Sequence, residues 1–310
     1  MLTGPPDCFA TTLISSKNCL APTSISRRRF LKIAAATGAL AVGADALLLE
    51  PNHPVVTRVE IPLLRLPREF DGFTMVQLSD FHFDPYFSAI PIRKAVRLAK
   101  DLNPDLVVLT GDFVSAPVVK EQVSNNRASM QAYPCSEILK DLTARQGIWA
   151  VMGNHDAATS SVHVQTALMQ VGIQVLSNRA VPIERRGRRF WLAGIDDVLV
   201  GFPNLKAALH DVPPAEPVVL LAHEPDFADH SANHSVDLQL SGHSHGGQVR
   251  IPWAGAIYLP PMGRKYPRGL RKIKDLTLYT NVGLGTLYVP VRFACAAELT
   301  FITLKSLAPA

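Results

Sequence analysis

Five short motifs rich in metal-binding side chains recur along this chain, and most of them follow an apolar, strand-like run. They read Ser79-Asp80-Phe81-His82, Thr110-Gly111-Asp112, Gly153-Asn154-His155-Asp156, Ala222-His223-Glu224 and Gly242-His243-Ser244-His245. Loops that follow buried strands in α/β proteins meet at one edge of a sheet and carry functional groups there. The fold must therefore bring carboxylate, amide and imidazole groups together at the strand ends.

The spacing of apolar residues predicts alternating strands and helices from about Val55 onward. We expect strands at 55–64, 73–78, 105–109, 147–152, 173–176, 181–186, 189–195, 217–221, 248–251, 276–281 and 298–304, and helices at 90–102, 121–142, 162–171 and 205–210. The first half alternates strand with helix, whereas the second half is rich in strands. This order predicts an α/β (α+β) fold, a four-layer αββα sandwich in which two facing mixed β-sheets are flanked by helices.

The first 46 residues have the features of a targeting leader. Residues 26–32 read Ser-Arg-Arg-Arg-Phe-Leu-Lys, which matches the twin-arginine export pattern, and an apolar run follows from Ile33 to about Leu49. The alternative is a membrane anchor, although the run is a little shorter than the ~20 apolar residues of a spanning helix and Asp45 interrupts it. Ala44-Asp45-Ala46 is a plausible cleavage site.

We therefore expect a leader at 1–46 and a single domain at 47–310. The twin-arginine machinery would export the folded protein to the periplasm or to the outer face of the cytoplasmic membrane, with retention as an anchor left open. The chain has a net charge of +5, but without the leader the net charge is only +2. We therefore expect no nucleic-acid partner. Cys135 and Cys295 could form a disulfide or stay as two separate buried thiols, and the second arrangement is expected.

The side-chain types indicate a borderline metal ion. Alternate residues of a strand point the same way, so Asp80 and His82 could reach one ion, as could His243 and His245 on an extended segment. Carboxylates and imidazoles suit zinc, manganese or iron, and the absence of a thiolate excludes a structural zinc finger. Each motif alone is more simply explained as a turn or, for His223, as a hydrogen-bonded core histidine. The order of all five in one chain favours a metal site.

Together the five motifs resemble those of the calcineurin-like metallophosphoesterases. Residues 280–285 (Thr-Asn-Val-Gly-Leu-Gly) and 290–293 (Pro-Val-Arg-Phe) resemble the bacterial exported phosphodiesterase branch of this superfamily, and the leader fits the same branch. One departure is Ala296-Ala297 before Glu298, where that branch commonly has a Pro-rich dipeptide. The resemblance implies a phosphoesterase domain that binds two divalent metal ions.

The resemblance also assigns ligands. It implies a first metal ion held by Asp80, His82, Asp112 and His245, and a second held by Asp112, Asn154, His223 and His243. Asp112 would bridge two ions, and a water or hydroxide between them would attack phosphorus. The ions would be manganese, zinc or iron.

His155 is expected to face the substrate rather than a metal ion, since its neighbour Asn154 is a ligand. The resemblance makes His155 a general acid for the leaving oxygen or a transition-state stabiliser. Asp156 would orient the His155 ring or, equally, cap the loop.

The expected reaction is hydrolysis of a phosphodiester, with phosphorylated envelope glycolipids or sugar-nucleotide-like pyrophosphates as plausible substrates. Arg250 and Arg292 are candidate substrate-binding residues, and an apolar segment at Trp253, Ile257, Tyr258 and Leu259 would suit a lipid-linked phosphoester. The alternatives are a phosphomonoesterase, a metal-dependent hydrolase that acts on another bond, and a non-catalytic binding scaffold with the same fold.

Overall fold

The computed structural model describes residues 1, 4, 26–117 and 122–307, so most of the predicted leader lies outside the described residues. The chain forms two compact units, 1–42 and 43–310. Helix α1 (Arg27–Ala44) has no buried side chain and continues into a π-helical turn, η1 (Asp45–Leu49). Within the described part of the chain, one helix, Arg27–Leu49, is long and apolar enough to cross a membrane, a property that signal sequences share.

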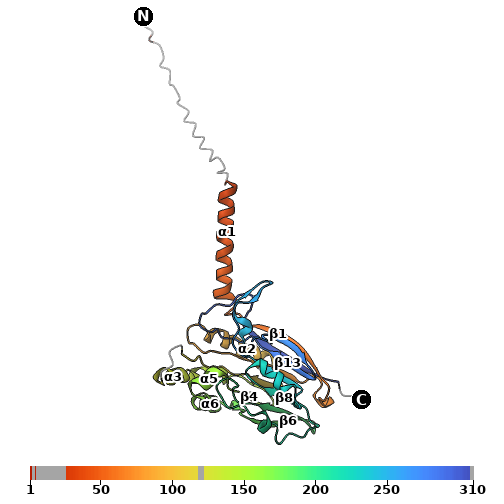
Figure 1. Ribbon diagram of the computed structural model, residues 1–310. Coiled ribbons are helices and arrows are strands. Elements are labelled where there is room, and N and C mark those ends of the chain that lie inside the picture. Colours follow the sequence, from red (N-terminus) through yellow and green to blue (C-terminus); the bar gives the residue numbers. More distant parts are fainter. Residues whose placement is uncertain (2–3, 5–25, 118–121, 308–310) are drawn as a thin grey trace. The chain divides into compact units, whose positions relative to one another are not determined.

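The larger unit contains two six-stranded sheets (Figure 1). The first has the order β1-β14-β2-β3-β4-β5, in which β14 is antiparallel to β2 and the other pairs are parallel. Its strands are β1 (Val55–Leu63), β2 (Thr74–Leu78), β3 (Leu106–Leu109), β4 (Ile148–Ala150), β5 (Gln174–Val175) and β14 (Glu298–Ser306).

The second sheet has the order β12-β13-β9-β8-β7-β6, with hairpins at both edges and parallel pairs between. Its strands are β6 (Arg179–Arg185), β7 (Arg188–Gly194), β8 (Val218–Leu221), β9 (Leu238–Ser241), β12 (Gly269–Ile273) and β13 (Leu276–Thr280). A separate two-stranded hairpin is formed by β10 (Arg250–Ile251) and β11 (Gly255–Ala256).

Three apolar clusters confirm the predicted four layers. One lies between the two sheets and includes Met75 and Val108 from the first sheet and Leu221 and Leu240 from the second. The two others lie on the outer faces of the sheets, beneath helices. Those helices are α2 (Ala89–Leu102), α4 (Ala132–Leu139) and α6 (Ser161–Gln170) on the first sheet and α7 (Leu205–Ala208) and α8 (Ala228–Ser231) on the second.

Several elements differ from the sequence-based expectation. The helix expected at 121–142, whose first residue lies outside the described residues, is two helices, α3 (Gln122–Ser129) and α4. Strands β9 and β12 and the short helix α5 (Asn154–Thr159) are additional elements. Strand β12 escapes prediction because it is an edge strand whose charged side chains are exposed, so it lacks the apolar alternation of a half-buried strand. The remaining short helical turns are η2 (Arg68–Phe70), η3 (Pro225–Phe227) and η4 (His245–Gly247).

The two cysteines of the larger unit are free and buried, as expected.

Candidate metal centre

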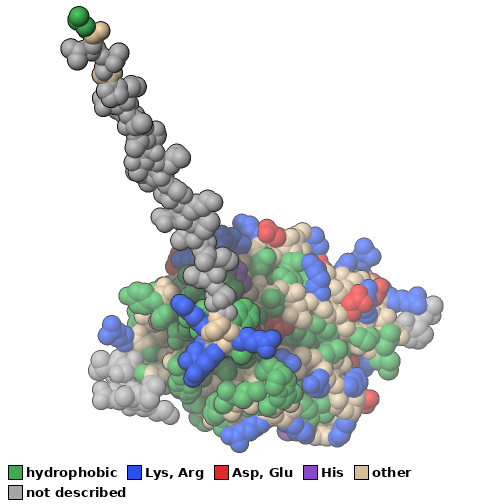
Figure 2. All heavy atoms as spheres, turned by 90° about the horizontal axis from the view of Figure 1, so that it is seen from above, with side chains coloured by type: hydrophobic (Ala, Val, Ile, Leu, Met, Phe, Trp, Pro, Cys, Tyr) green, Lys and Arg blue, Asp and Glu red, His purple; other side chains and the backbone are tan. Residues whose placement is uncertain are grey.

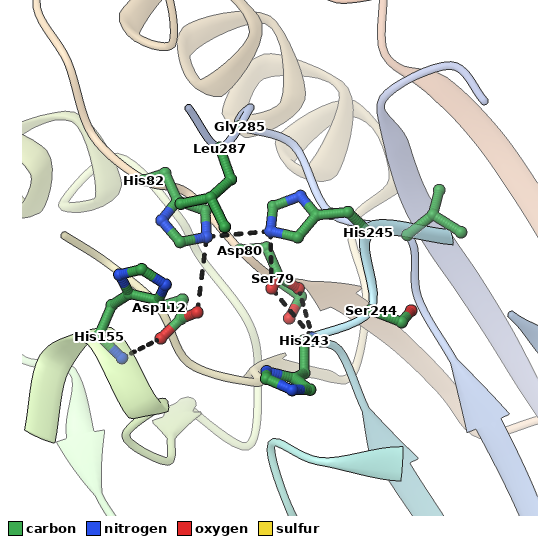
Figure 3. Close-up of polar contacts among 12 residues, drawn as sticks. Ser79, Asp80, His82, Asp112, His155, His243, Ser244, His245, Gly285 and Leu287 are labelled. Atoms are coloured by element: carbon green, nitrogen blue, oxygen red, sulfur yellow. Dashed lines mark hydrogen bonds and ion pairs between the residues drawn. The ribbon is translucent and has the colours of Figure 1, made fainter. Parts of the chain in front are cut away.

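The five motifs lie at the ends of strands β2, β3, β4, β8 and β9. Figure 3 shows five of the seven candidate ligands close together there: Asp80, His82, Asp112, His243 and His245. Two clusters of potential ligand atoms share no residue. Asp80, His82 and His245 form one, and Asp112, His223 and His243 form the other, with the ligand atoms of each cluster within 4.8 Å of one another. A third group, His82, Asp112 and His155, overlaps both clusters. Both clusters are buried, so a charge placed there would be shielded from water.

Asp112 lies between the two clusters. Its Oδ2 atom is 3.5 Å from Nε2 of His82 in the first cluster and 3.2 Å from Nε2 of His223 in the second. Its Oδ1 atom accepts a hydrogen bond of 2.9 Å from the backbone N–H of His155. One carboxylate oxygen thus faces ligands of both clusters, as a shared metal ligand would.

The remaining contacts connect each cluster internally. Nε2 of His245 is 3.0 Å from Nε2 of His82 and 3.4 Å from Oδ1 of Asp80. In the second cluster, Nδ1 of His243 is 2.9 Å from Oδ1 of Asn154. Asn154, predicted as a ligand, therefore lies beside the group that contains His223 and His243.

Three of the four imidazoles are held by a hydrogen bond on the nitrogen that faces away from the cluster. Nδ1 of His82 pairs with Oγ of Ser115 at 3.1 Å, and Nε2 of His243 pairs with the carbonyl of Pro261 at 2.8 Å. Nδ1 of His223 pairs with the carbonyl of Thr110. Such outer partners fix the tautomer and the ring orientation of metal-binding histidines.

Burial keeps most of these imidazoles neutral, which is the form that binds metal ions. It lowers the pKa of His82 to about 3 and the pKa of His243 to about 4. Burial, together with His82, also holds the pKa of His245 well below its usual value. His223 is different: burial opposes its charge, but Asp112 and Asp80 raise its pKa well above the usual range. The carboxylates of Asp112 and Asp80 thus favour the charged form of His223.

The donor set fits a pair of divalent ions. It consists of imidazole nitrogens, carboxylate oxygens and one amide oxygen, which suit borderline and hard cations. Within the described part of the chain, Nε2 of His223 is buried and makes no hydrogen bond of good geometry, although Oδ2 of Asp112 lies 3.2 Å away. Burial also raises the pKa of Asp80 to about 6, a cost that a neighbouring cation would reduce.

The candidate ligands come together in loops and not, as expected, by the alternation of side chains along a strand. Strand β2 ends at Leu78 and strand β9 at Ser241, so the ligand pairs that follow them lie in loops and not on extended segments. Five ligands have left-handed backbone conformations, with φ between 40° and 67°: Asp80, His82, Asp112, His243 and His245. Such conformations are uncommon for residues other than glycine and concentrate at functional sites.

Two glycines allow the loops of the centre to approach closely. Gly111 has φ of 94°, and a Cβ atom there would lie 2.6 Å from the backbone nitrogen of Gly153. A Cβ atom at Gly153 would in turn lie 2.6 Å from the backbone nitrogen of Asp112. Only glycine permits this backbone-to-backbone contact, which brings Asp112 and Asn154 to the same site.

Asp156 stabilises the same loop contact. Its buried carboxylate accepts four backbone hydrogen bonds: from Asp112 at 2.8 Å, Phe113 at 2.9 Å, Val114 at 3.2 Å and Gly153 at 3.0 Å. The loop-capping alternative therefore describes Asp156, which positions the residues that follow β3.

A backbone hydrogen bond fixes the ring of His155. Its Nδ1 atom accepts a hydrogen bond of 2.8 Å from the backbone N–H of Ala116. Ala116 thus fixes the ring, and the expectation that Asp156 does so is wrong. With Nδ1 acting as acceptor, the proton of the neutral ring is on Nε2. The ring packs edge-on against His82, with centroids 4.8 Å apart, and it lines the cavity described next.

A cavity of about 570 Å³ opens onto the metal-facing groups. Its polar residues include Asp112, Asn154, His155, His243 and His245. Its apolar residues come from three separate segments: Leu199, Val249, Ile257, Tyr258, Pro260, Pro261, Leu287, Tyr288 and Val289. Ile257 and Tyr258 were expected to suit a lipid and line this cavity, whereas Trp253 and Leu259 do not belong to its lining.

The two arginines proposed for substrate binding have other contacts. Arg292 is completely buried, and its guanidinium donates hydrogen bonds to the carbonyls of Val282, Gly283, Gly285 and Cys295. The expectation that Arg292 binds substrate is therefore wrong, because the side chain holds a turn together. Arg250 is part-buried, and its guanidinium donates to the carbonyl of Gly246 at 2.6 Å. It does not line the cavity.

Gln248 is a site residue that the sequence did not reveal. Its carboxamide donates to the carbonyls of Leu287 at 3.2 Å and Val289 at 3.0 Å and accepts from the N–H of Leu287 at 2.7 Å. It thereby joins the loop after η4 to the segment that carries Leu287 and Tyr288, both of which line the cavity. The Gly-Gly-Gln sequence gave no signal of this role.

Comparisons with known proteins agree with the geometry. A family model for calcineurin-like phosphoesterases matches residues 73–247, which include all five motifs. The chain is 34% identical over 290 residues to YkuE of Bacillus subtilis, an uncharacterised metallophosphoesterase, with 91% of this chain and 98% of YkuE aligned. It is 32% identical over 288 residues to phosphodiesterase YaeI of Escherichia coli, covering 90% and 99% of the two chains.

A third relative acts on a lipid. The chain is 27% identical over 307 residues to the UDP-2,3-diacylglucosamine pyrophosphatase LpxG of Chlamydia trachomatis, covering 81% of this chain and 89% of LpxG. The site geometry, the family model and these relatives establish that the chain belongs to the calcineurin-like phosphoesterase family and is a phosphoric ester hydrolase.

Proposed function

We propose that this protein hydrolyses a phosphodiester or pyrophosphate bond in a lipid-linked substrate with the help of two divalent metal ions. The observation that carries the proposal is the composition of the cavity, whose lining combines candidate metal ligands with a larger set of apolar residues. A substrate that fits such a cavity has a phosphoryl group next to a large apolar group.

The charge of the cavity supports a diester over a monoester. Of the described residues that line it, none is a Lys or an Arg. A phosphomonoester carries about two negative charges near neutral pH, as phosphorylated side chains do, and the second charge calls for a further cationic group. A diester carries one negative charge, which the metal ions alone can balance.

Each side chain has a part in this proposal. Asp80, His82, Asp112 and His245 would hold one ion, and Asp112, Asn154, His223 and His243 the other. Divalent ions supply Lewis-acid chemistry, which lowers the pKa of water and offsets charge on phosphoryl oxygens. His155 donates the proton on Nε2 to the leaving oxygen, while Ala116 holds the ring. Leu287 and Tyr258 exclude water from the reacting group.

The relatives are consistent with this substrate class. YaeI is a phosphodiesterase, and LpxG cleaves the pyrophosphate of a diacylated sugar nucleotide. The natural substrate we propose is accordingly an acylated phosphodiester or pyrophosphate of the cell envelope.

An assay with matched substrates tests the proposal. The full chain in detergent micelles, with Mn²⁺, Zn²⁺ or Fe²⁺ added in turn, is given bis(4-nitrophenyl) phosphate, 4-nitrophenyl phosphate, a diacylated sugar nucleotide and its deacylated counterpart. We expect the diester to be cleaved at least ~10-fold more efficiently than the monoester. Burying about four methylenes of an acyl chain is worth roughly 3 kcal/mol, so the acylated substrate should gain roughly 100-fold in kcat/KM. A preference for the monoester would contradict the proposed diester specificity. Equal rates with and without acyl chains would contradict the proposed lipid-linked substrate.

The site of action follows from the leader. We propose that the twin-arginine route exports the protein to the outer face of the cytoplasmic membrane, as residues 26–32 indicate. Replacing Arg27 and Arg28 together by Lys should leave the protein in the cytoplasmic fraction, while an Arg29→Lys control is exported. Unchanged fractionation of the double variant would contradict this route.

A further inference from the structure

We infer that the face around the cavity mouth docks on a phospholipid bilayer, with the N-terminal helix kept as an anchor. The first observation is that the predicted cleavage site is part of the folded larger unit. Ala46 is buried in η1, and its carbonyl accepts a hydrogen bond of 2.9 Å from the N–H of Arg292. Susceptibility of a chain to cleavage depends on the burial and hydrogen bonding of its backbone. The bond after Ala46 is therefore protected.

Glu50, immediately after η1, strengthens this attachment. Its carboxylate accepts hydrogen bonds of 2.9 Å from the N–H groups of Ala294 and Cys295. Its carbonyl accepts a further bond of 3.2 Å from Ala297. The end of the apolar helix Arg27–Leu49 is thus built into the domain that carries the metal centre.

Exposed apolar side chains extend from η1 to the cavity mouth. We call them the apolar collar: Leu47 and Leu48 in η1, Ile251 and Trp253 in the β10–β11 hairpin, and Tyr288 and Val289 in the loop between β13 and β14, all exposed. Trp253, at the hairpin tip, is 99% exposed. Figure 2 shows hydrophobic side chains, with Lys and Arg among them, on the face seen from above. Exposed apolar surface of this kind marks an interaction site.

Hydrogen bonds join the three parts of the collar. Arg292, next to the loop of Tyr288, is bonded to Ala46 of η1, and Leu47 and Leu48 share a groove of about 420 Å³ with Gly285 and Pro290. Gln248, next to β10, holds the same loop from the other side. The collar is therefore one connected surface and not a set of independent loops.

A bilayer is the occupant that this surface fits. The collar begins at the end of a 23-residue helix that is apolar enough to span a membrane, so Leu47 and Leu48 lie at the membrane boundary when the helix is inserted. Trp253 and Tyr288 are the residue types that concentrate at this boundary. Tyr288 and Val289 belong to both the collar and the cavity wall, so docking would open the cavity towards the lipid.

Tryptophan fluorescence tests the docking without reference to catalysis. The sequence has three tryptophans, of which Trp149 and Trp191 are 8% and 9% exposed. The full chain is reconstituted in phosphatidylcholine–phosphatidylglycerol vesicles with and without acyl chains brominated at positions 6 and 7. We expect bromine to quench the emission of Trp253 and the membrane to protect it from acrylamide. The Trp253→Phe variant, with only the core tryptophans, should lose this quenching.

Two comparisons make the test decisive. A Trp253→Phe/Met169→Trp variant carries an exposed tryptophan on α6 and should be quenched by acrylamide but not by brominated lipid. Intact mass of the membrane-extracted chain should include residues 44–46. Removal of these residues would overturn the anchor. Docking would be overturned if acrylamide still quenched Trp253 fluorescence in vesicles. It would also be overturned if Trp253 were shielded only when the chain forms a dimer.

An effect of membrane docking on hydrolysis rests on the proposed function, and a separate measurement tests it. An Ile251→Ser/Trp253→Ser variant should hydrolyse soluble bis(4-nitrophenyl) phosphate at the wild-type rate but lose roughly 10-fold in rate on an acylated substrate held in vesicles. Wild-type rates of this variant on both substrates, together with quenching of Trp253 in the wild-type chain, would show docking that does not serve the substrate. That result would overturn this catalytic step and leave the membrane contact established.

Discussion

The Asp112→Asn variant is expected to lose at least ~10³-fold in kcat/KM on a phosphodiester, together with most of its bound metal. The reason is the position of Oδ2, which lies 3.5 Å from His82 in one cluster and 3.2 Å from His223 in the other. Asn has nearly the same shape as Asp but lacks the charge, so both ligand clusters lose the same anion. Steady-state kinetics and elemental analysis of the purified variant measure the two losses.

A matched control separates this effect from a general loss of charge. Asp229→Asn removes an exposed carboxylate that pairs with Lys265 at 2.7 Å, away from the clusters. We expect wild-type activity and metal content for this control. A folded Asp112→Asn protein that kept two metal ions per chain would refute the shared-ligand role of Asp112.

The second large effect is expected for His155→Ala. General acid catalysis contributes typically ~10²–10⁴-fold, and the variant should lose that much in kcat with its metal content unchanged. The Nδ1 atom of His155 is occupied by the N–H of Ala116, so Nε2 is the atom free to donate to the leaving oxygen. A leaving group of low pKa needs little help from an acid, and the loss on an aryl diester should accordingly be smaller than on an alkyl diester.

The difference between leaving groups distinguishes an acid from a merely structural residue. A structural role would reduce both rates equally. His163→Ala is a suitable control, because His163 also pairs through Nδ1 with a neighbour, Oγ of Ser129 at 2.9 Å, but lies outside the clusters. Loss of metal from the His155→Ala variant would instead identify His155 as a ligand.

The sequence predicts most of the fold because the inner strands are short, continuous apolar runs. Strands β3 and β8 are entirely buried, and the β6–β7 hairpin turns at Gly187 as expected. The edge strand β12 pairs only with its neighbour β13, through a tight turn, and its central residues are exposed. Such a strand lacks the apolar alternation of a half-buried strand, so a local apolar pattern does not predict it.

The sequence also predicts only part of the candidate site. The order of the motifs places the candidate ligands at strand ends, yet the expected alternation does not bring Asp80 and His82 together, because both have positive φ. Backbone conformations of this kind are imposed by the surrounding loops. The burial of Arg292 could not be foreseen either, since its carbonyl partners belong to a turn formed by residues 282–285 and to Cys295.

Titration of metal-free protein with Mn²⁺ tests the two-metal phosphodiesterase most directly. Hydrolysis of bis(4-nitrophenyl) phosphate is followed as the ion is added, with the Asp112→Asn variant alongside. We expect the activity of the wild-type chain to saturate at two equivalents per chain and the variant to remain inactive throughout. Saturation at one equivalent, or hydrolysis that needs no metal ion, would contradict a centre in which Asp112 serves two ions.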